Sequence, residues 1–132
     1  MYKRQVLEGT AYEMEYIRRR AGQVTGLALD SISVVGGGAQ SRTWLQIKAD
    51  VSGIPLSAPK IPEAALLGAA LVAGIGCRVY ASQRAAFSSL ASPEVETFLP
   101  DERRHAAYRR LYERGFLAFQ EPLRAFSRPG GS

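Results

Sequence analysis

Three consecutive glycines, Gly36 to Gly38, stand between a short apolar run and a segment with strong helical signals. The preceding residues 31–35 alternate and then become fully apolar, which predicts a strand with a buried end. Ser41 is a good N-cap, and residues 42–52 can form a helix that Gly53 ends. The sequence therefore predicts a tight strand–glycine turn–helix unit.

This turn is a candidate phosphate or nucleotide site, because glycine has no Cβ to hold a ligand away and the helix N-terminus adds a favourable dipole. A tight strand-to-helix turn also requires glycine when nothing binds, so the motif alone leaves both interpretations open. Two well-known phosphate motifs do not fit. A dinucleotide fingerprint starting at Gly36 needs a glycine where the chain has Ser41 and an acid near residues 56–58. No Gly-Lys-Ser/Thr sequence of a P-loop is present.

Elsewhere, helical periodicity dominates the chain. Helices are expected over residues 6–24, 62–74, 82–89 and from 101 onward. A brief extended segment over 54–57 is the second recognisable strand, a loop is expected around Pro93 and Pro100, and Pro122 should kink the last helix. Two strands are fewer than the about five of an average sheet. We therefore expect a helix-rich α/β piece of a larger domain.

Composition and charge exclude several functional classes. The 132 residues suit one domain, and 46% hydrophobic with 22% charged residues is typical of a globular protein. One cysteine, Cys77, excludes an internal disulfide and a multi-cysteine zinc site, and fits a reducing, cytoplasmic location. The longest apolar stretch, 64–77, is shorter than the roughly 20 residues of a membrane span. The net charge of +5 comes from arginines interleaved with acids, which indicates solvated helix faces rather than a nucleic-acid interface.

Four segments in order carry a resemblance to a known family. Val35–Pro55, which contains the three glycines, closely resembles the C-terminal domain of the FGGY carbohydrate kinases. Glu63–Gly74 is similar to the Glu-x-x-x-Leu-Gly-Ala-Ala helix of that family. Leu7–Tyr12 resembles the helix before the strand, and His105–Tyr112 resembles the terminal helix. The resemblance covers about residues 6–126.

The resemblance implies the C-terminal part of an actin-like ATPase (ribonuclease H-like) lobe. Enzymes of this family hold ATP and Mg²⁺ between two lobes and phosphorylate a hydroxyl of a ketose, polyol or sugar acid. The implied cofactor-binding residues are Gly36, Gly37, Gly38 and Ser41. Gly37 and Ser41 fall where the family motif places nucleotide contacts. The position of Ser41 is often asparagine in glycerol kinases, so serine shortens the reach of this group, and its other interpretation is a plain N-cap.

The resemblance places no catalytic residue and no metal ligand in this chain. In the family, the aspartate that takes the proton and the phosphate-binding loop lie in upstream segments, which would also hold most of the Mg²⁺ contacts. Asp50 lies about nine residues from the glycine turn, roughly 14 Å of helical rise, and is expected to be structural. Glu63 is expected to serve the first turn of its helix.

Four other residues have ordinary structural interpretations. His105 lies on a polar helix and Cys77 follows a glycine-rich stretch, so they are interpreted as a non-catalytic residue and a small packing residue. Trp44 is expected in the core or at a lobe contact, with stacking on a base as the alternative. The alanine- and glycine-rich surface over 68–73 is expected to allow close helix packing.

The sequence thus predicts three parts: a truncation scar or disordered start over 1–5, the FGGY C-terminal domain over 6–126, incomplete at its N-terminal side, and a disordered tail over 127–132. The expected function is the nucleotide-contacting portion of an ATP-dependent carbohydrate kinase, inactive by itself. Its expected partners are ATP or ADP, a sugar or polyol, and a missing N-terminal lobe, without nucleic acid or membrane. The alternatives are a non-catalytic actin-like nucleotide-binding module and a basic nucleic-acid-interacting domain.

Overall fold

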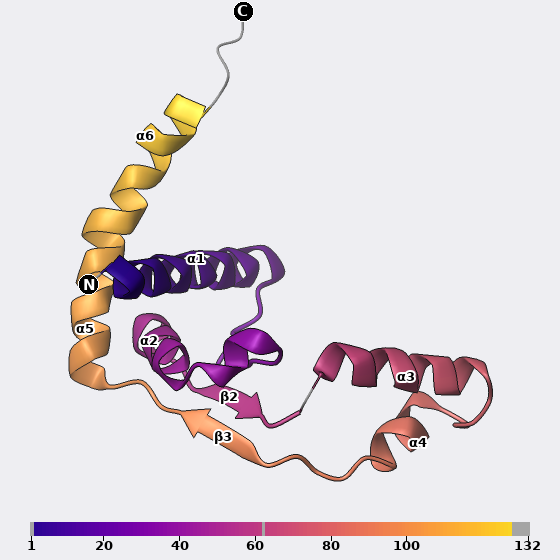
Figure 1. Ribbon diagram of the computed structural model, residues 1–132. Coiled ribbons are helices and arrows are strands. Elements are labelled where there is room, and N and C mark those ends of the chain that lie inside the picture. The colour runs from indigo at the N-terminus through magenta and orange to yellow at the C-terminus, as the bar shows by residue number, and fades with distance from the viewer. Residues whose placement is uncertain (1, 62, 128–132) are drawn as a thin grey trace, which may run out of the picture.

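The structure, a computed structural model, describes residues 2–61 and 63–127 (Figure 1). The elements in chain order are α1 (Tyr2–Thr25), β1 (Ile32–Ser33), a 3₁₀ turn (Gly37–Gln40), α2 (Arg42–Ser52), β2 (Leu56–Pro59), α3 (Ala64–Gly76), α4 (Gln83–Ser88), β3 (Val95–Phe98), α5 (Glu102–Leu111), a π-helical segment (Tyr112–Phe116) and α6 (Leu117–Ser127). The helix-rich α/β character predicted from the sequence is confirmed. No helix in the described part of the chain is long and apolar enough to cross a membrane.

The sheet has three strands in the order β1-β2-β3, so the prediction of two strands is wrong. β1 pairs with β2 in parallel, with Ile32 opposite Leu56, and β2 pairs with β3 antiparallel, with Leu56 opposite Phe98. β3 lies in the stretch that the sequence indicated as a loop, because only six residues separate Pro93 from Pro100. Its extended conformation comes from pairing with β2, which is distant in sequence and leaves no local signal.

α2 is the central element, with the sheet on one side and α1 and α5 on the other (Figure 1). The buried cluster on the sheet side consists of Leu45, Ala49, Leu56, Ala58 and Phe98. The buried cluster on the helical side consists of Ala11, Ile47, Val51 and Tyr108. Both faces of α2 are therefore covered, and the glycine turn at its start is fixed on a packed scaffold.

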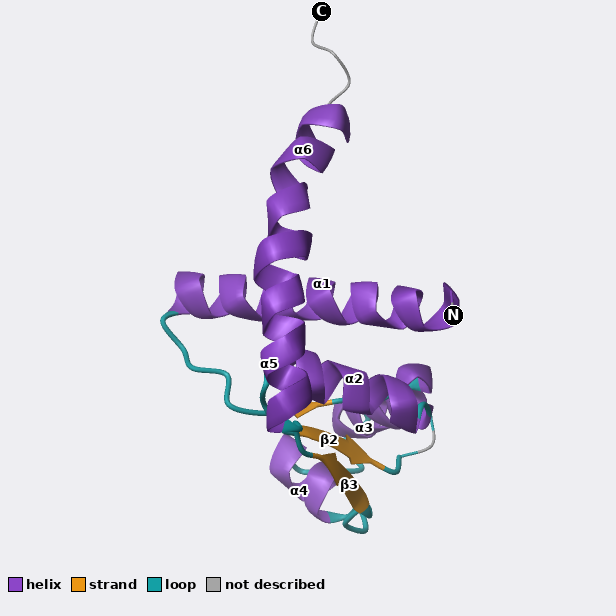
Figure 2. Ribbon diagram, turned by 90° about the vertical axis from the view of Figure 1, so that its left-hand side faces the viewer, coloured by secondary structure: helices purple, strands orange, loops and turns teal. Residues whose placement is uncertain are grey.

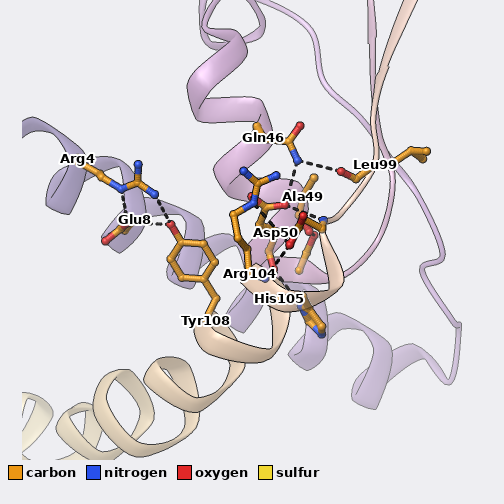
Figure 3. Close-up of polar contacts among 11 residues, drawn as sticks. Arg4, Glu8, Gln46, Ala49, Asp50, Leu99, Arg104, His105 and Tyr108 are labelled. Carbon is orange, nitrogen blue, oxygen red and sulfur yellow. Dashed lines mark hydrogen bonds and ion pairs between the residues drawn. The ribbon is translucent and has the colours of Figure 1, made fainter.

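α1 begins at Tyr2, so the expected disordered start is wrong for residues 2–5. Arg4 Nε donates to Glu8 Oε1 at 2.8 Å, and Arg4 Nη2 donates to the Tyr108 hydroxyl at 3.0 Å. Tyr108 in turn donates to Glu8 Oε1 at 2.8 Å (Figure 3). These contacts tie the first turns of α1 to α5. Of the predicted tail, Ser127 ends α6, and residues 128–132 lie outside the described residues.

α5, the π-helical segment and α6 form one continuous helical rod that crosses α1 (Figure 2). At the crossing, Tyr112 and Phe116 stack with their ring centroids 5.5 Å apart, and both rings contact Tyr12. The departure from α-helical geometry lies here, ahead of Pro122, which stands inside α6. Packing of these rings on α1 accompanies the widened turn.

Candidate nucleotide-binding site

A cavity of about 610 Å³ opens beside the glycine turn. Its walls come from the turn, the start of α2, the end of β2, the N-terminal end of α3 and β3; they include Gly36, Gly37, Arg42, Ala58, Lys60, Ala64, Ala65 and Glu96. α3 lies to one side of the sheet (Figure 1), and its N-terminal end faces the glycine turn and the start of α2 across this cavity. The turn predicted as a ligand site therefore faces open space.

The structure gives an internal reason for glycine at two of the three positions, Gly36 and Gly38. Gly36 has φ +86° and ψ −169°, a conformation that residues with a Cβ rarely adopt. A Cβ on Gly37 would meet no atom within 4 Å, so the chain itself gives this position no reason to lack a side chain. A Cβ on Gly38 would lie 2.9 Å from Cζ3 of Trp44. Gly37 therefore faces open space at the cavity, whereas Gly38 is constrained by the packing of Trp44.

Ser41 acts as the N-cap of α2. Its Oγ accepts the Trp44 backbone N–H at 3.4 Å, and its carbonyl oxygen accepts that of Leu45 at 3.0 Å. Ser41 and Gly38 are not part of the cavity wall, whereas Gly36 and Gly37 are. The structure therefore brings two of the four predicted residues to the cavity, and a nucleotide contact by the other two stays a prediction.

The cavity wall also carries charges that the sequence reasoning did not single out. Arg42, the first residue of α2, forms an ion pair with Glu96 on β3, and its guanidinium lies 5.7 Å from the centre of the Phe98 ring. Lys60 also lines the cavity and pairs with Glu94 at 2.7 Å. The position of Arg42 directly after the N-cap was a usable signal, because that end of the helix faces the turn. Glu96 was hidden because β3 was not predicted.

Asp50 is a structural residue, as its place in the helix indicated. Its carboxylate is buried and accepts from Gln46 Nε2 and from the Asp101 backbone N–H, each at 2.9 Å. Arg104 Nε lies 2.9 Å from its other oxygen (Figure 3). His105 Nδ1–H donates to the Asp50 backbone carbonyl at 2.9 Å, so His105 also has a structural contact. Neither residue lines the cavity.

Of three further residues that the sequence singled out, Glu63 lines the cavity, whereas Cys77 and Trp44 do not. Glu63 lines the cavity just before α3 with φ +48°, and its carbonyl oxygen accepts the Leu67 N–H, while its side chain makes no capping bond. Cys77, expected to pack, is exposed at the C-cap of α3, so that expectation is wrong. Trp44 is half-buried and is not part of the cavity wall.

The cavity wall has the features of a nucleotide site. Open space above Gly37, an adjoining helix N-terminus and two nearby cations fit a nucleotide. No group of three His, Cys, Asp or Glu residues that could hold a metal ion exists within residues 2–61 and 63–127. The cavity wall thus fits a nucleotide, and the described residues contain no cluster that would hold a metal ion with three or more side chains.

The family model of the "FGGY family of carbohydrate kinases, C-terminal domain" matches residues 3–77. This chain belongs to that family. It is 36% identical over 110 residues to the L-xylulose/3-keto-L-gulonate kinase of Escherichia coli K12, covering 83% of this chain and 22% of that protein. It is 34% identical over 93 residues to the autoinducer-2 kinase of the same strain, covering 70% of this chain and 17% of that protein.

Solved structures of FGGY kinases share the fold. A "xyloylose kinase" from Brucella ovis superposes with a TM-score of 0.73 and 27% identity over 92% of this chain and 24% of its own. The xylulose kinase from Rhodospirillum rubrum gives a TM-score of 0.67 and 26% identity over the same shares. The actin-like ATPase fold predicted from the FGGY motifs is confirmed. The chain spans about a fifth of the length of the curated FGGY relatives it matches.

Proposed function

We propose that this chain forms the nucleotide-contacting part of an ATP-dependent carbohydrate kinase that phosphorylates a hydroxyl of a sugar or polyol. The observation that carries the proposal is the open cavity over Gly37, in a chain that belongs to the FGGY family. A glycine without an internal packing reason, at the wall of a cavity of about 610 Å³, is what close approach of a nucleotide to the backbone requires.

The residues at the cavity would contribute to ATP binding in different ways. Gly36 and Gly37 would allow the nucleotide to approach the backbone, and the N-terminal end of α3 would favour its negative charge. Arg42 and Lys60 place two further positive charges beside the cavity. ATP supplies the phosphoryl group that is transferred. Gly38 and Ser41 remain predicted nucleotide contacts of the family motif.

The catalytic base and the Mg²⁺ contacts are proposed to belong to the rest of the kinase. Phosphoryl transfer to a hydroxyl requires a carboxylate to take the proton and groups that stabilise the γ-phosphate. The two carboxylates at the cavity have other surroundings: Glu96 pairs with Arg42, and Glu63 lies in a left-handed backbone position ahead of α3. We therefore expect no phosphorylation of sugars or polyols by the 132-residue chain alone.

The partner of this chain is proposed to be the remaining part of such a kinase. α3 contains only apolar residues and glycine, yet Leu71 is its one buried residue. Leu66 and Val72 are 66% and 70% exposed. An uncharged helix of this length is ordinarily covered by another element. β1 likewise has a neighbour on one edge only within the described residues. The rest of the kinase would cover both.

The substrate is proposed only as a class. The two relatives described above are named for L-xylulose or 3-keto-L-gulonate and for autoinducer-2, which is consistent with a small sugar or sugar derivative. The residues that contact the sugar are expected outside this chain.

Isothermal titration of the 132-residue chain with ATP tests the proposal. Saturable binding is expected, and Gly37→Val should weaken it at least tenfold because the new side chain fills the space above the turn. Gly9→Val is the matched control, since Gly9 lies on α1 in open space and outside the cavity wall. Absence of ATP binding by the unaltered chain, or equal affinities for Gly37→Val and Gly9→Val, would contradict the proposal.

A further inference from the structure

The indole ring of Trp44 packs against the glycine turn at Gly38 and is not part of the cavity wall. A Cβ on Gly38 would lie 2.9 Å from Cζ3 of Trp44, so the ring edge lies directly against the turn backbone. No atom of Trp44 belongs to the cavity wall, which instead includes Gly36 and Gly37. The ring therefore contacts the turn without facing the space proposed for the nucleotide, which disfavours stacking on a base.

Contacts from two helices hold the Trp44 ring in place. Its Nε1–H donates to Thr10 Oγ1 on α1 at 3.1 Å, and the Thr10 hydroxyl donates to the Leu7 carbonyl at 2.9 Å. On α2, Lys48 Nζ lies 3.7 Å from the centre of the ring. Burial lowers the pKa of Lys48, which agrees with an ammonium group packed against the ring rather than extended into water. The ring is thus fixed by α1 and α2 together.

The turn itself has one internal hydrogen bond, from the Ala39 N–H to the Gly36 carbonyl at 3.0 Å. Because Gly36 and Gly37 carry no side chains, they have no side-chain packing of their own to restrict their conformation. The neighbouring Gly38 lies against a large aromatic ring that is itself anchored. Rigid support of this kind lowers the entropy cost of binding a ligand at the turn.

We infer that Trp44 is a positioning residue of the nucleotide site, which fixes the Gly36–Gly38 turn against α1 and α2 so that its backbone is ordered before the nucleotide binds. The inference rests on the proposed function for its consequence in ATP affinity, and it concerns a residue that does not itself contact the nucleotide.

Titration of ATP into four variants tests this consequence. Trp44→Leu should weaken ATP affinity about tenfold. Thr10→Val, which keeps the shape of the side chain but removes the acceptor of the indole N–H and the donor to the Leu7 carbonyl, should weaken it about threefold. Trp44→Phe retains an aromatic ring beneath the turn and should recover most of the affinity. Glu13→Gln, on the exposed face of α1, should leave the affinity unchanged. ATP affinities of Trp44→Leu and Thr10→Val equal to that of the unaltered chain would overturn the inference.

A double-mutant cycle between Gly38 and Trp44 separates the effect of their direct contact on ATP affinity from a general loss of stability. Gly38→Ala alone should weaken ATP binding because its methyl group meets the ring at 2.9 Å. In Gly38→Ala with Trp44→Leu, the smaller side chain makes room for that methyl group. The double variant should therefore bind ATP at least as well as Gly38→Ala alone. If the loss of ATP affinity in the double variant equalled the product of the losses in the two single variants, the two residues would act independently and the inference would be overturned.

Amide hydrogen exchange gives a readout that does not depend on ATP. Trp44→Leu should accelerate exchange of the Ala39 amide about tenfold and leave the Gly53 amide, which bonds to the Ala49 carbonyl at the far end of α2, unchanged. Equal acceleration at both amides, or at neither, would overturn the inference. If the unaltered chain binds no ATP, the proposed function fails, whereas acceleration confined to Ala39 would still establish that Trp44 orders the turn.

Discussion

Arg104 on α5 directs its Nε to Asp50 Oδ2 on α2 at 2.9 Å, and this contact joins the start of the last helical rod to the central helix. The other Asp50 oxygen accepts from Gln46 Nε2 and the Asp101 N–H. Gln46 also donates to the Leu99 carbonyl at 2.9 Å (Figure 3). Asp50 and Gln46 on α2 therefore anchor the junction between β3 and α5 together, and β3 carries Glu96 to the cavity.

Asp50→Ala should lower the free energy of unfolding by about 1–3 kcal/mol, because the Asp101 N–H and the Gln46 amide lose a buried acceptor. Urea denaturation of the 132-residue chain measures the effect. Glu13→Ala, which removes an exposed carboxylate from α1, should change the same free energy by less than about 0.5 kcal/mol. Equal effects of the two variants would show that the Asp50 contacts do not stabilise the fold.

Gly53→Ala should destabilise the chain, and the identical change at Gly9 should stabilise it. Gly53 ends α2 with φ +70°, and a Cβ there would lie 2.5 Å from Cε1 of His105. The left-handed conformation alone costs about 1–2 kcal/mol with a side chain. Gly9 lies inside α1 with no atom near a Cβ, so alanine should add about 0.5–1 kcal/mol of stability.

Thermal unfolding of both glycine variants gives the comparison. Adding His105→Ala to Gly53→Ala should recover the part of the lost stability that comes from the clash with the His105 ring. The part that comes from the left-handed backbone conformation at position 53 should remain. A Gly53→Ala melting temperature equal to or above that of the unaltered chain would rule out both causes.

The stability of the helical crossing should fall at alkaline pH. Burial, with a smaller contribution from the negative charge of Glu8, raises the pKa of Tyr12 to about 12. An unfolded tyrosine ionises near pH 10, so between pH 10 and 12 the unfolded state loses a proton that the folded state retains. The contribution of Tyr12 is therefore fully present below pH 10 and is lost as the pH rises through 12.

Tyr12→Phe removes this ionisation and isolates its effect. Urea unfolding should show the phenylalanine variant gaining stability relative to the unaltered chain between pH 10 and 12. The same comparison at pH 7 and pH 8 should give a constant difference. A difference that stays constant up to pH 12 would mean that the folded-state pKa of Tyr12 is not raised.

Glu96→Gln should tighten ATP binding about two- to fivefold at low ionic strength, because it removes a negative charge from the cavity wall and releases Arg42 from its ion pair. The gain should shrink in 0.5 M NaCl, where charges are screened within a few ångströms. Glu13→Gln makes the same charge change away from the cavity and should have no effect. Calorimetric titration of ATP at low ionic strength and in 0.5 M NaCl measures the effect. Weaker ATP binding by Glu96→Gln than by the unaltered chain would refute the prediction.

The local sequence determined the turn and the helix that follows it. Glycine at 36, an N-cap at Ser41 and glycine at 53 are signals confined to a few residues, and the structure realises each of them through backbone conformation or capping. The order and spacing of the Val35–Pro55 and Glu63–Gly74 motifs predicted the FGGY family and its fold, which the family match and the solved structures confirm.

Contacts between residues distant in sequence decided the rest. β3 is a strand because it pairs with β2, some 40 residues away, and residues 2–5 are helical in a segment where Arg4 contacts Glu8 and Tyr108. The cavity exists because α3, β3 and the glycine turn come together in space, which also separates Gly37, facing open space, from Gly38, lying against Trp44. Backbone turns and caps are encoded locally, whereas a strand edge, a buried carboxylate or a cavity wall depends on partners that only the folded chain brings near.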